Sequence, residues 1–160
     1  MVDMLSETGV SKEADYVTHQ TQYQQGGDSV RRVFEDAESA REYYGRYVSF
    51  VRTVRPAGGT KLLDLGCGNG WSSELLHGEG FNVTGLEVTR EAFSRPEAKG
   101  LRFVVGSAES LPFERGEFDI VSSYQVLEHV ANPAAALLEM IRVTRGGGEL
   151  WWLAQTCSAR

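Results

Sequence analysis

The chain has 160 residues, a net charge of −6 and 18 glycines, which is about 11% glycine against about 7% in average proteins. With 22 acidic against 16 basic residues and no basic run, binding to nucleic acid or to an anionic membrane surface is disfavoured. No stretch reaches the ~18 consecutive apolar residues of a membrane-spanning helix. Cys67 and Cys157 form no CxxC pair, and residues 1–27 lack the apolar core of a secretory signal, so we expect a reduced, cytoplasmic protein.

The first 57 residues divide into two predicted segments. Residues 1–27 are polar and rich in glutamine, and we expect a flexible N-terminal arm or a lid that orders on ligand. Residues 28–57 show apolar side chains at helical spacing and predict a helical cap of two short helices or one bent one. The run from Arg55 to Gly59 stops this cap.

From residue 58 to residue 160, short apolar runs alternate with helical segments. We expect strands at 61–65, 82–87, 101–105, 118–122 and 149–154. We expect helices from Trp71 to about His77, from about Thr89, and from Pro133 with Asn132 as N-cap and Gly146 as its end. This alternation predicts an α/β fold, a Rossmann-like doubly wound parallel sheet of five strands with helices on both faces.

The excess glycine concentrates at the end of the first predicted strand, where Gly66, Gly68 and Gly70 alternate with other residues. Glycine allows positive φ and close approach of a ligand to the backbone, and the helix that follows points free amide groups at a bound molecule. A tight strand-to-helix turn without a ligand is the alternative. Three glycines at alternate positions exceed what a turn needs, so a ligand is favoured.

The second predicted strand ends in Glu87, whose carboxylate can accept both hydroxyls of a ribose. The alternative is a solvated acidic side chain in a loop. A dinucleotide fingerprint, G-x-G-x-x-G, requires glycine at position 71, where this chain has Trp71. An NAD-dependent oxidoreductase is therefore the less favoured interpretation.

Four stretches together resemble the class I S-adenosylmethionine-dependent methyltransferases of the small-molecule type, which includes quinone-biosynthesis enzymes. They are LDLGCGNG (63–70), VTGLE (83–87), GSAESLPF (106–113) and FDIV (118–121) running into VLEHV (126–130). The resemblance covers about residues 61–148. It implies a sheet of strand order 3-2-1-4-5, S-adenosylmethionine as cofactor, and methyl transfer to a small organic acceptor.

The resemblance also implies a set of cofactor-binding residues. The glycine loop would surround the methionine moiety, Glu87 and its neighbour would hold the ribose, the loop after the third strand would meet the adenine, and the residues after the fourth strand would line the sulfonium side. Family members usually have Asp where this chain has Ser107, which removes a charge from the adenine contact. The implied residues are Asp64, Gly66, Cys67, Gly68, Asn69, Gly70, Glu87, Val88, Ser107, Ala108, Glu109, Tyr124 and Gln125.

Other reactive side chains have weaker functional interpretations. His129 is a candidate general base, although the resemblance implies a mainly architectural role for it. Cys67 is expected to pack rather than to act as a nucleophile. Tyr43 and Tyr44 are expected to be core aromatics of a helix, with a roof over the substrate as the alternative. The three histidines show no metal-ligand spacing, so no metal is expected.

The sequence after the fourth predicted strand lacks two motifs that would indicate a nucleic-acid base as the methyl acceptor. Ser122-Ser123-Tyr124-Gln125 is neither the Asn/Asp-Pro-Pro-aromatic stretch of base-amino methylases nor the Pro-Cys stretch of cytosine-carbon methylases. A small organic molecule is therefore the expected acceptor, and its reacting atom stays open.

The fifth predicted strand is unusual, because Trp151 and Trp152 would face opposite sides of the sheet and one would crowd a helix layer. The family's C-terminal antiparallel hairpin is expected to be missing, so the domain is expected to be truncated and its fifth strand to be an apolar edge that self-associates. A frameshift near Gly148 is the favoured hypothesis, because the shifted frame must encode valine at the junction of the two Trp codons. Resequencing tests it. A native short variant or a trimmed chain is the alternative. The functional alternative is a catalytically silent remnant that binds the cofactor.

Overall fold

The computed structural model describes residues 37–90 and 101–153. Five strands form one sheet: β1 (Lys61–Leu65), β2 (Asn82–Glu87), β3 (Arg102–Val105), β4 (Phe118–Tyr124) and β5 (Thr144–Leu153). Their order is β3-β2-β1-β4-β5 and every pairing is parallel, so the predicted fold class and strand order are confirmed. Beyond residue 90, the helix expected from about Thr89 lies outside the described residues, as do the arm at 1–27 and the first part of the cap.

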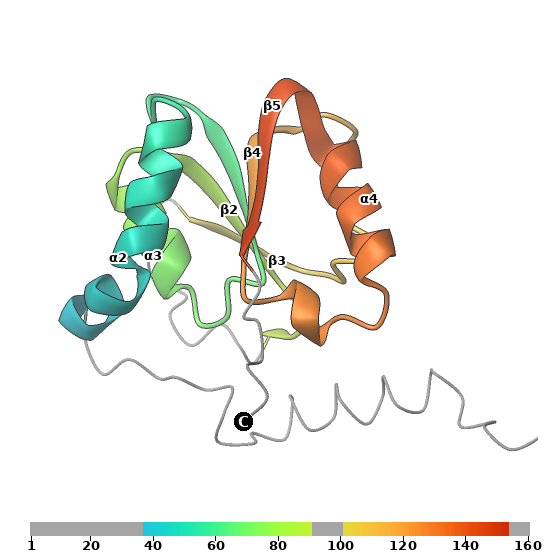
Figure 1. The fold of residues 1–160 in the computed structure, drawn as a ribbon, viewed down its shortest axis with the longest axis horizontal. Coiled ribbons are helices and arrows are strands. Elements are labelled where there is room, and N and C mark those ends of the chain that lie inside the picture. Colours follow the sequence, from blue (N-terminus) through green and yellow to red (C-terminus); the bar gives the residue numbers. More distant parts are fainter. Residues whose placement is uncertain (1–36, 91–100, 154–160) are drawn as a thin grey trace, which may run out of the picture. The chain divides into compact units, whose positions relative to one another are not determined.

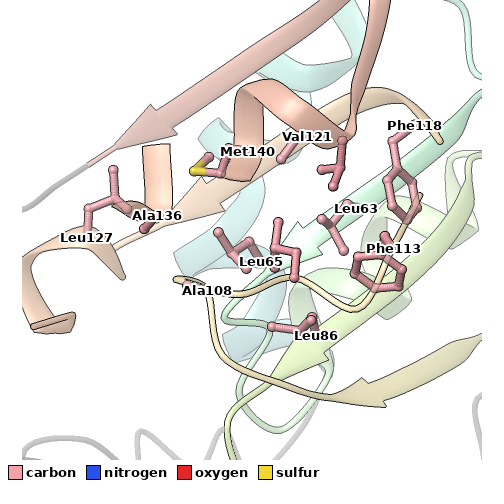
Figure 2. Close-up of a cluster of buried hydrophobic side chains, with 12 residues drawn as sticks. Leu63, Leu65, Leu86, Ala108, Phe113, Phe118, Val121, Leu127, Ala136 and Met140 are labelled. Carbon is pink, nitrogen blue, oxygen red and sulfur yellow. The ribbon is translucent and has the colours of Figure 1, made fainter. Parts of the chain in front are cut away.

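Helices cover both faces of this sheet (Figure 1). Alternate residues of the central strands face opposite sides, so two apolar clusters form. On one face, Leu62 and Ile120 pack with α2 (Ala37–Val54) and α3 (Trp71–Gly78). On the other, Leu63, Leu65 and Val121 pack with α4 (Pro133–Val143) and the loop before β4 (Figure 2). The α2 segment therefore shares its core with the sheet.

The predicted start of α4 is confirmed. The Asn132 side chain accepts a hydrogen bond from the Ala135 amide at 3.1 Å, and Pro133 is the first helical residue. The predicted end at Gly146 is wrong, because the helix stops at Val143 and the chain continues directly into β5. Thr144 takes an extended conformation, and its amide and hydroxyl both donate to the Met140 carbonyl, so no glycine is needed there.

The glycines at 146–148 belong instead to an irregular start of β5. Phe118 pairs with Thr144 and Ile120 with Glu149, so β5 contains extra residues at this point. A Cβ on Gly148 would lie 2.7 Å from the Asp119 carbonyl oxygen, which explains why glycine is required beside β4. The strand consequently begins at Thr144 rather than at the expected residue 149.

The expected crowding by the two tryptophans does not occur. Trp151 packs edge-on against Phe50 of α2, with ring centroids 4.8 Å apart, and stays 37% exposed. Trp152 is 52% exposed. Trp151 therefore lies against α2 without being enclosed by it, because β5 is the edge strand of the sheet in the described residues. Among residues 37–90 and 101–153, no helix is both long and apolar enough to cross a lipid bilayer.

Candidate cofactor and acceptor site

The candidate site lies at the carboxyl ends of β1, β2 and β4. The chain runs from β1 outward to β2 and β3, then returns to place β4 on the other side of β1. Strand order therefore reverses between β1 and β4, and ligands of open α/β sheets bind outside the carboxyl ends of the strands at such a point. The glycine loop leaves β1 here, and Tyr124 and Gln125 lie at the end of β4.

The three loop glycines all have positive φ, but they meet different surroundings. A Cβ on Gly66 would lie 2.2 Å from a methyl of Val126, and one on Gly70 would lie 2.9 Å from the ring of Phe103. A Cβ on Gly68 would meet nothing within 4 Å. Packing therefore demands glycine at 66 and 70 with or without a ligand, whereas Gly68 is the position where a ligand can approach the backbone.

Glu87 ends β2 directly beside this open position. Its carboxylate accepts the Gly68 amide at 3.0 Å through one oxygen and the Val88 amide at 2.7 Å through the other. Burial raises the pKa of Glu87, and the two backbone donors oppose that rise. Each carboxylate oxygen keeps a second lone pair, so the group can still accept hydrogen bonds from a diol.

Asp64 forms the buried centre of the site. Both Ser72 and Ser73, in the first turn of α3, donate their hydroxyls to one carboxylate oxygen at 2.7 Å. The Tyr47 hydroxyl of α2 lies 3.3 Å from the other oxygen and 2.7 Å from the Ser122 hydroxyl of β4. Burial raises the pKa of Asp64, and the three hydroxyls partly offset this. Asp64 thus joins β1, α2, α3 and β4 beneath the glycine loop.

Side chains of the loop after β3 form hydrogen bonds within the loop and to the residues just before α4. Ser107 Oγ accepts the Glu109 amide at 3.2 Å, and Ala108 is buried in the α4-side core. Glu109 Oε1 accepts the amides of Ala131 and Asn132, at 3.0 and 3.2 Å, just before α4. In this arrangement the Glu109 carboxylate anchors the loop to the start of α4. The adenine contact expected of 107–109 stays a prediction.

An aromatic cluster borders the site where β4 ends. Tyr124 contacts Tyr43, Tyr44 and Tyr47 of α2, with ring centroids 5.9, 5.6 and 5.0 Å away. The Tyr43 hydroxyl donates to Gln125 Oε1 at 2.8 Å, and Gln125 has φ of 57°, a left-handed conformation. Sequence reasoning singled out Tyr43 and Tyr44 as core aromatics, but gave Tyr47 no role in the site. The i, i+4 spacing of Tyr43 and Tyr47 places both on one face of the helix, and this spacing was the sequence signal for a role of Tyr47 beside Tyr43.

The remaining candidates contribute less. Cys67 is buried, and burial with the nearby charges of Asp64 and Glu87 raises its pKa well above the usual range, which suits a packing residue. His129 ends the short 3-10 helix η2 (Leu127–His129) and is exposed. Asn69 is half-buried in the loop between Gly68 and Gly70. Within the described part of the chain, no three His, Cys, Asp or Glu side chains group closely enough to ligate a metal ion.

The strand order and the position of the glycine loop define a Rossmann-like domain. A family model described as a methyltransferase domain matches residues 63–152, more than half of the chain, so the chain belongs to that family. The match includes the loop glycines, Glu87, Ser107 and Gln125.

Two curated relatives and one solved structure extend this comparison. The chain is 32% identical over 130 residues to 2-methyl-6-phytyl-1,4-hydroquinone methyltransferase of Synechocystis sp., covering 73% of this chain and 41% of that protein. It is 33% identical over 106 residues to ubiquinone biosynthesis O-methyltransferase of Thiobacillus denitrificans, covering 62% and 46%. The chain thus spans less than half the length of these curated relatives.

The solved structure supports the fold. A putative S-adenosyl-L-methionine-dependent methyltransferase from Methanococcus maripaludis superposes with a TM-score of 0.66 at 17% identity, over 94% of this chain and 68% of that one. This likeness concerns the sheet and its helices.

Proposed function

We propose that this chain binds S-adenosylmethionine at the carboxyl ends of β1 and β2 and transfers its methyl group to a small organic acceptor. The observation that carries the proposal is the open backbone at Gly68 next to the Glu87 carboxylate, at the reversal point of the sheet. Membership of the methyltransferase-domain family supports it.

The residues present fit this cofactor. Gly68 leaves room for a ligand against the backbone, and the free lone pairs of Glu87 suit the two hydroxyls of a ribose. Trp71, in the position where a dinucleotide fingerprint has its third glycine, is a buried side chain at the start of α3. This arrangement favours S-adenosylmethionine over NAD.

When bound, S-adenosylmethionine supplies an electrophilic methyl group on its positively charged sulfur, and the sulfur is left as a neutral thioether after transfer. The chain's own task is to bind, orient and shield. Asp64 ties the end of β1, where the glycine loop begins, to α2 and α3. Glu87 would hold the ribose hydroxyls, and the tyrosines of α2 would exclude water from the end of β4. Holding donor and acceptor in line can lower a barrier by about 7–11 kcal/mol.

Calorimetry with S-adenosylmethionine, S-adenosylhomocysteine and NAD tests the proposal. The wild-type chain is expected to bind both sulfur ligands, and binding of NAD alone would overturn the assignment. Glu87→Ala is expected to weaken the binding of S-adenosylhomocysteine by about 1.5–3 kcal/mol, roughly 10- to 150-fold. Glu114→Ala, which removes an exposed carboxylate in the loop before β4, is the control and should bind like wild type. Cofactor binding without turnover on any acceptor would indicate a silent remnant.

A further inference from the structure

Gln125 has a backbone conformation that a purely structural corner does not need. Its backbone has φ of 57°, although its long side chain gains nothing from a left-handed conformation and glycine or asparagine would adopt it more easily. Its amide donates to the Leu153 carbonyl at 2.6 Å, which holds the end of β4 against β5 in this conformation. Such strained residues concentrate at sites where a side chain must be aimed.

The Gln125 carboxamide has a fixed orientation. Its Oε1 accepts the Tyr43 hydroxyl at 2.8 Å, so the amide nitrogen, Nε2, carries the two remaining N–H donors on the other side. Within residues 37–90 and 101–153, no acceptor receives a hydrogen bond from Nε2. The half-buried side chain therefore offers an oriented pair of donors beside the reversal point of the sheet.

The surroundings of these donors are aromatic. Tyr124 precedes Gln125 and is surrounded by Tyr43, Tyr44 and Tyr47, mostly in edge-to-face contacts. Tyr44 and Tyr47 lie near Asp64, and burial together with that negative charge raises the pKa of both phenols, so they stay protonated. A neutral aromatic surface next to two N–H donors suits a planar ring that carries an oxygen atom.

We propose that Gln125 orients the methyl acceptor by donating a hydrogen bond to an oxygen on an aromatic ring, and that Tyr43 positions the Gln125 carboxamide for this task. This assignment rests on the proposed function and adds the chemical class of the acceptor. Gln125 would touch the acceptor, whereas Tyr43 acts through Gln125.

The test measures acceptor binding to the full chain saturated with S-adenosylhomocysteine. The probes are 2-methyl-1,4-hydroquinone and 2-methylcyclohexane-1,4-diol, which share two oxygens and differ in the aromatic ring. Gln125→Met keeps the length of the side chain and removes the amide. Gln125→Asn keeps an amide and tolerates the left-handed backbone. Its side chain is one methylene shorter, so the two N–H donors no longer reach the same position. Tyr43→Phe removes only the hydroxyl, and Glu42→Gln, an exposed neighbour on α2, is the control.

Wild type and Glu42→Gln are expected to bind the hydroquinone at least ~10-fold more tightly than the saturated diol. Gln125→Met and Gln125→Asn should each lose about 10-fold in hydroquinone affinity and Tyr43→Phe a few-fold, in each case more than the variant loses in S-adenosylhomocysteine affinity. Equal binding of both probes, no binding of the hydroquinone, or undiminished binding by both Gln125 variants overturns the assignment. A Gln125 variant that loses more affinity for S-adenosylhomocysteine than for the hydroquinone also overturns the assignment. Failure of wild type to bind S-adenosylhomocysteine refutes the proposed function itself.

Discussion

The Tyr47 hydroxyl links α2 to the buried centre of the site, so Tyr47→Phe is a direct test of that network. The substitution removes a donor 3.3 Å from Asp64 and 2.7 Å from Ser122 without changing the size of the ring. A hydrogen bond to a charged group contributes about 1.5–3 kcal/mol and a neutral one about 0.5–1.5 kcal/mol. The Asp64 contact is long and Ser122 keeps the Leu63 carbonyl as acceptor, so we expect a loss of about 1.5 kcal/mol in the free energy of unfolding.

This loss should depend on pH. The pKa of Asp64 is raised in the folded chain, so the folded state holds a proton over a pH range in which the unfolded state has released it. The free energy of unfolding therefore falls as pH rises through that range. The Tyr47 hydroxyl lowers the Asp64 pKa, and removing it raises this pKa further. The loss in free energy of unfolding caused by Tyr47→Phe should be larger at about pH 7 than at about pH 4.5, where more of the Asp64 carboxyl is protonated.

Urea unfolding at both pH values measures these effects, in a double-mutant cycle with Asp64→Asn. A coupling energy of about 1 kcal/mol between the two substitutions is expected at the higher pH. If Tyr47→Phe changes the free energy of unfolding by less than about 0.5 kcal/mol at both pH values, the network does not hold α2 against the site.

Three further predictions concern the loops and the sheet edge. Gly66→Ala should lower the free energy of unfolding by about 2–4 kcal/mol, because its Cβ would overlap Val126, whereas Gly68→Ala should cost only about 1 kcal/mol; equal losses in urea unfolding would contradict this. Arg142→Met should cost about 1–3 kcal/mol, since its guanidinium donates to two loop carbonyls at 2.8 and 2.9 Å, and an unchanged unfolding midpoint would argue against that role. The prediction that the β5 edge self-associates is tested by Trp152→Lys, which should reduce concentration-dependent association in sedimentation velocity; wild-type chain that sediments as a monomer at every concentration rejects it.

Much of the fold follows from local sequence signals. The five apolar runs and the Asn132-Pro133 pair predicted the strands and the start of α4, because burial pattern and capping are properties of neighbouring residues. The start of β5 was mispredicted for the opposite reason. Gly148 is required by the carbonyl of Asp119 on another strand, so its role is visible only once the two strands pair.

The same distinction applies to the site. Glu87 and the glycine loop are adjacent in the fold because parallel strands bring their carboxyl ends together, and this was predictable from the order of strands and helices. The hydrogen bond between Tyr43 and Gln125 joins residues 82 positions apart, and the left-handed backbone of Gln125 has no signature in its residue type. These features depend on how α2 packs over the end of β4, which composition and spacing do not encode.

The glycine loop shows why a count of glycines is a weak signal for a ligand. Phe103 of β3 occupies the space that a side chain at position 70 would need, and Val126 that of position 66, so two of the three glycines are explained by the packing of this chain alone. Gly68 has the same backbone freedom and no neighbour within reach of a Cβ, yet its amide is already directed at Glu87. Gly68 is therefore the one loop glycine that points to a ligand. Substitutions at Gly68 and Glu87 can separate cofactor binding from folding, whereas substitutions at Gly66 and Gly70 cannot.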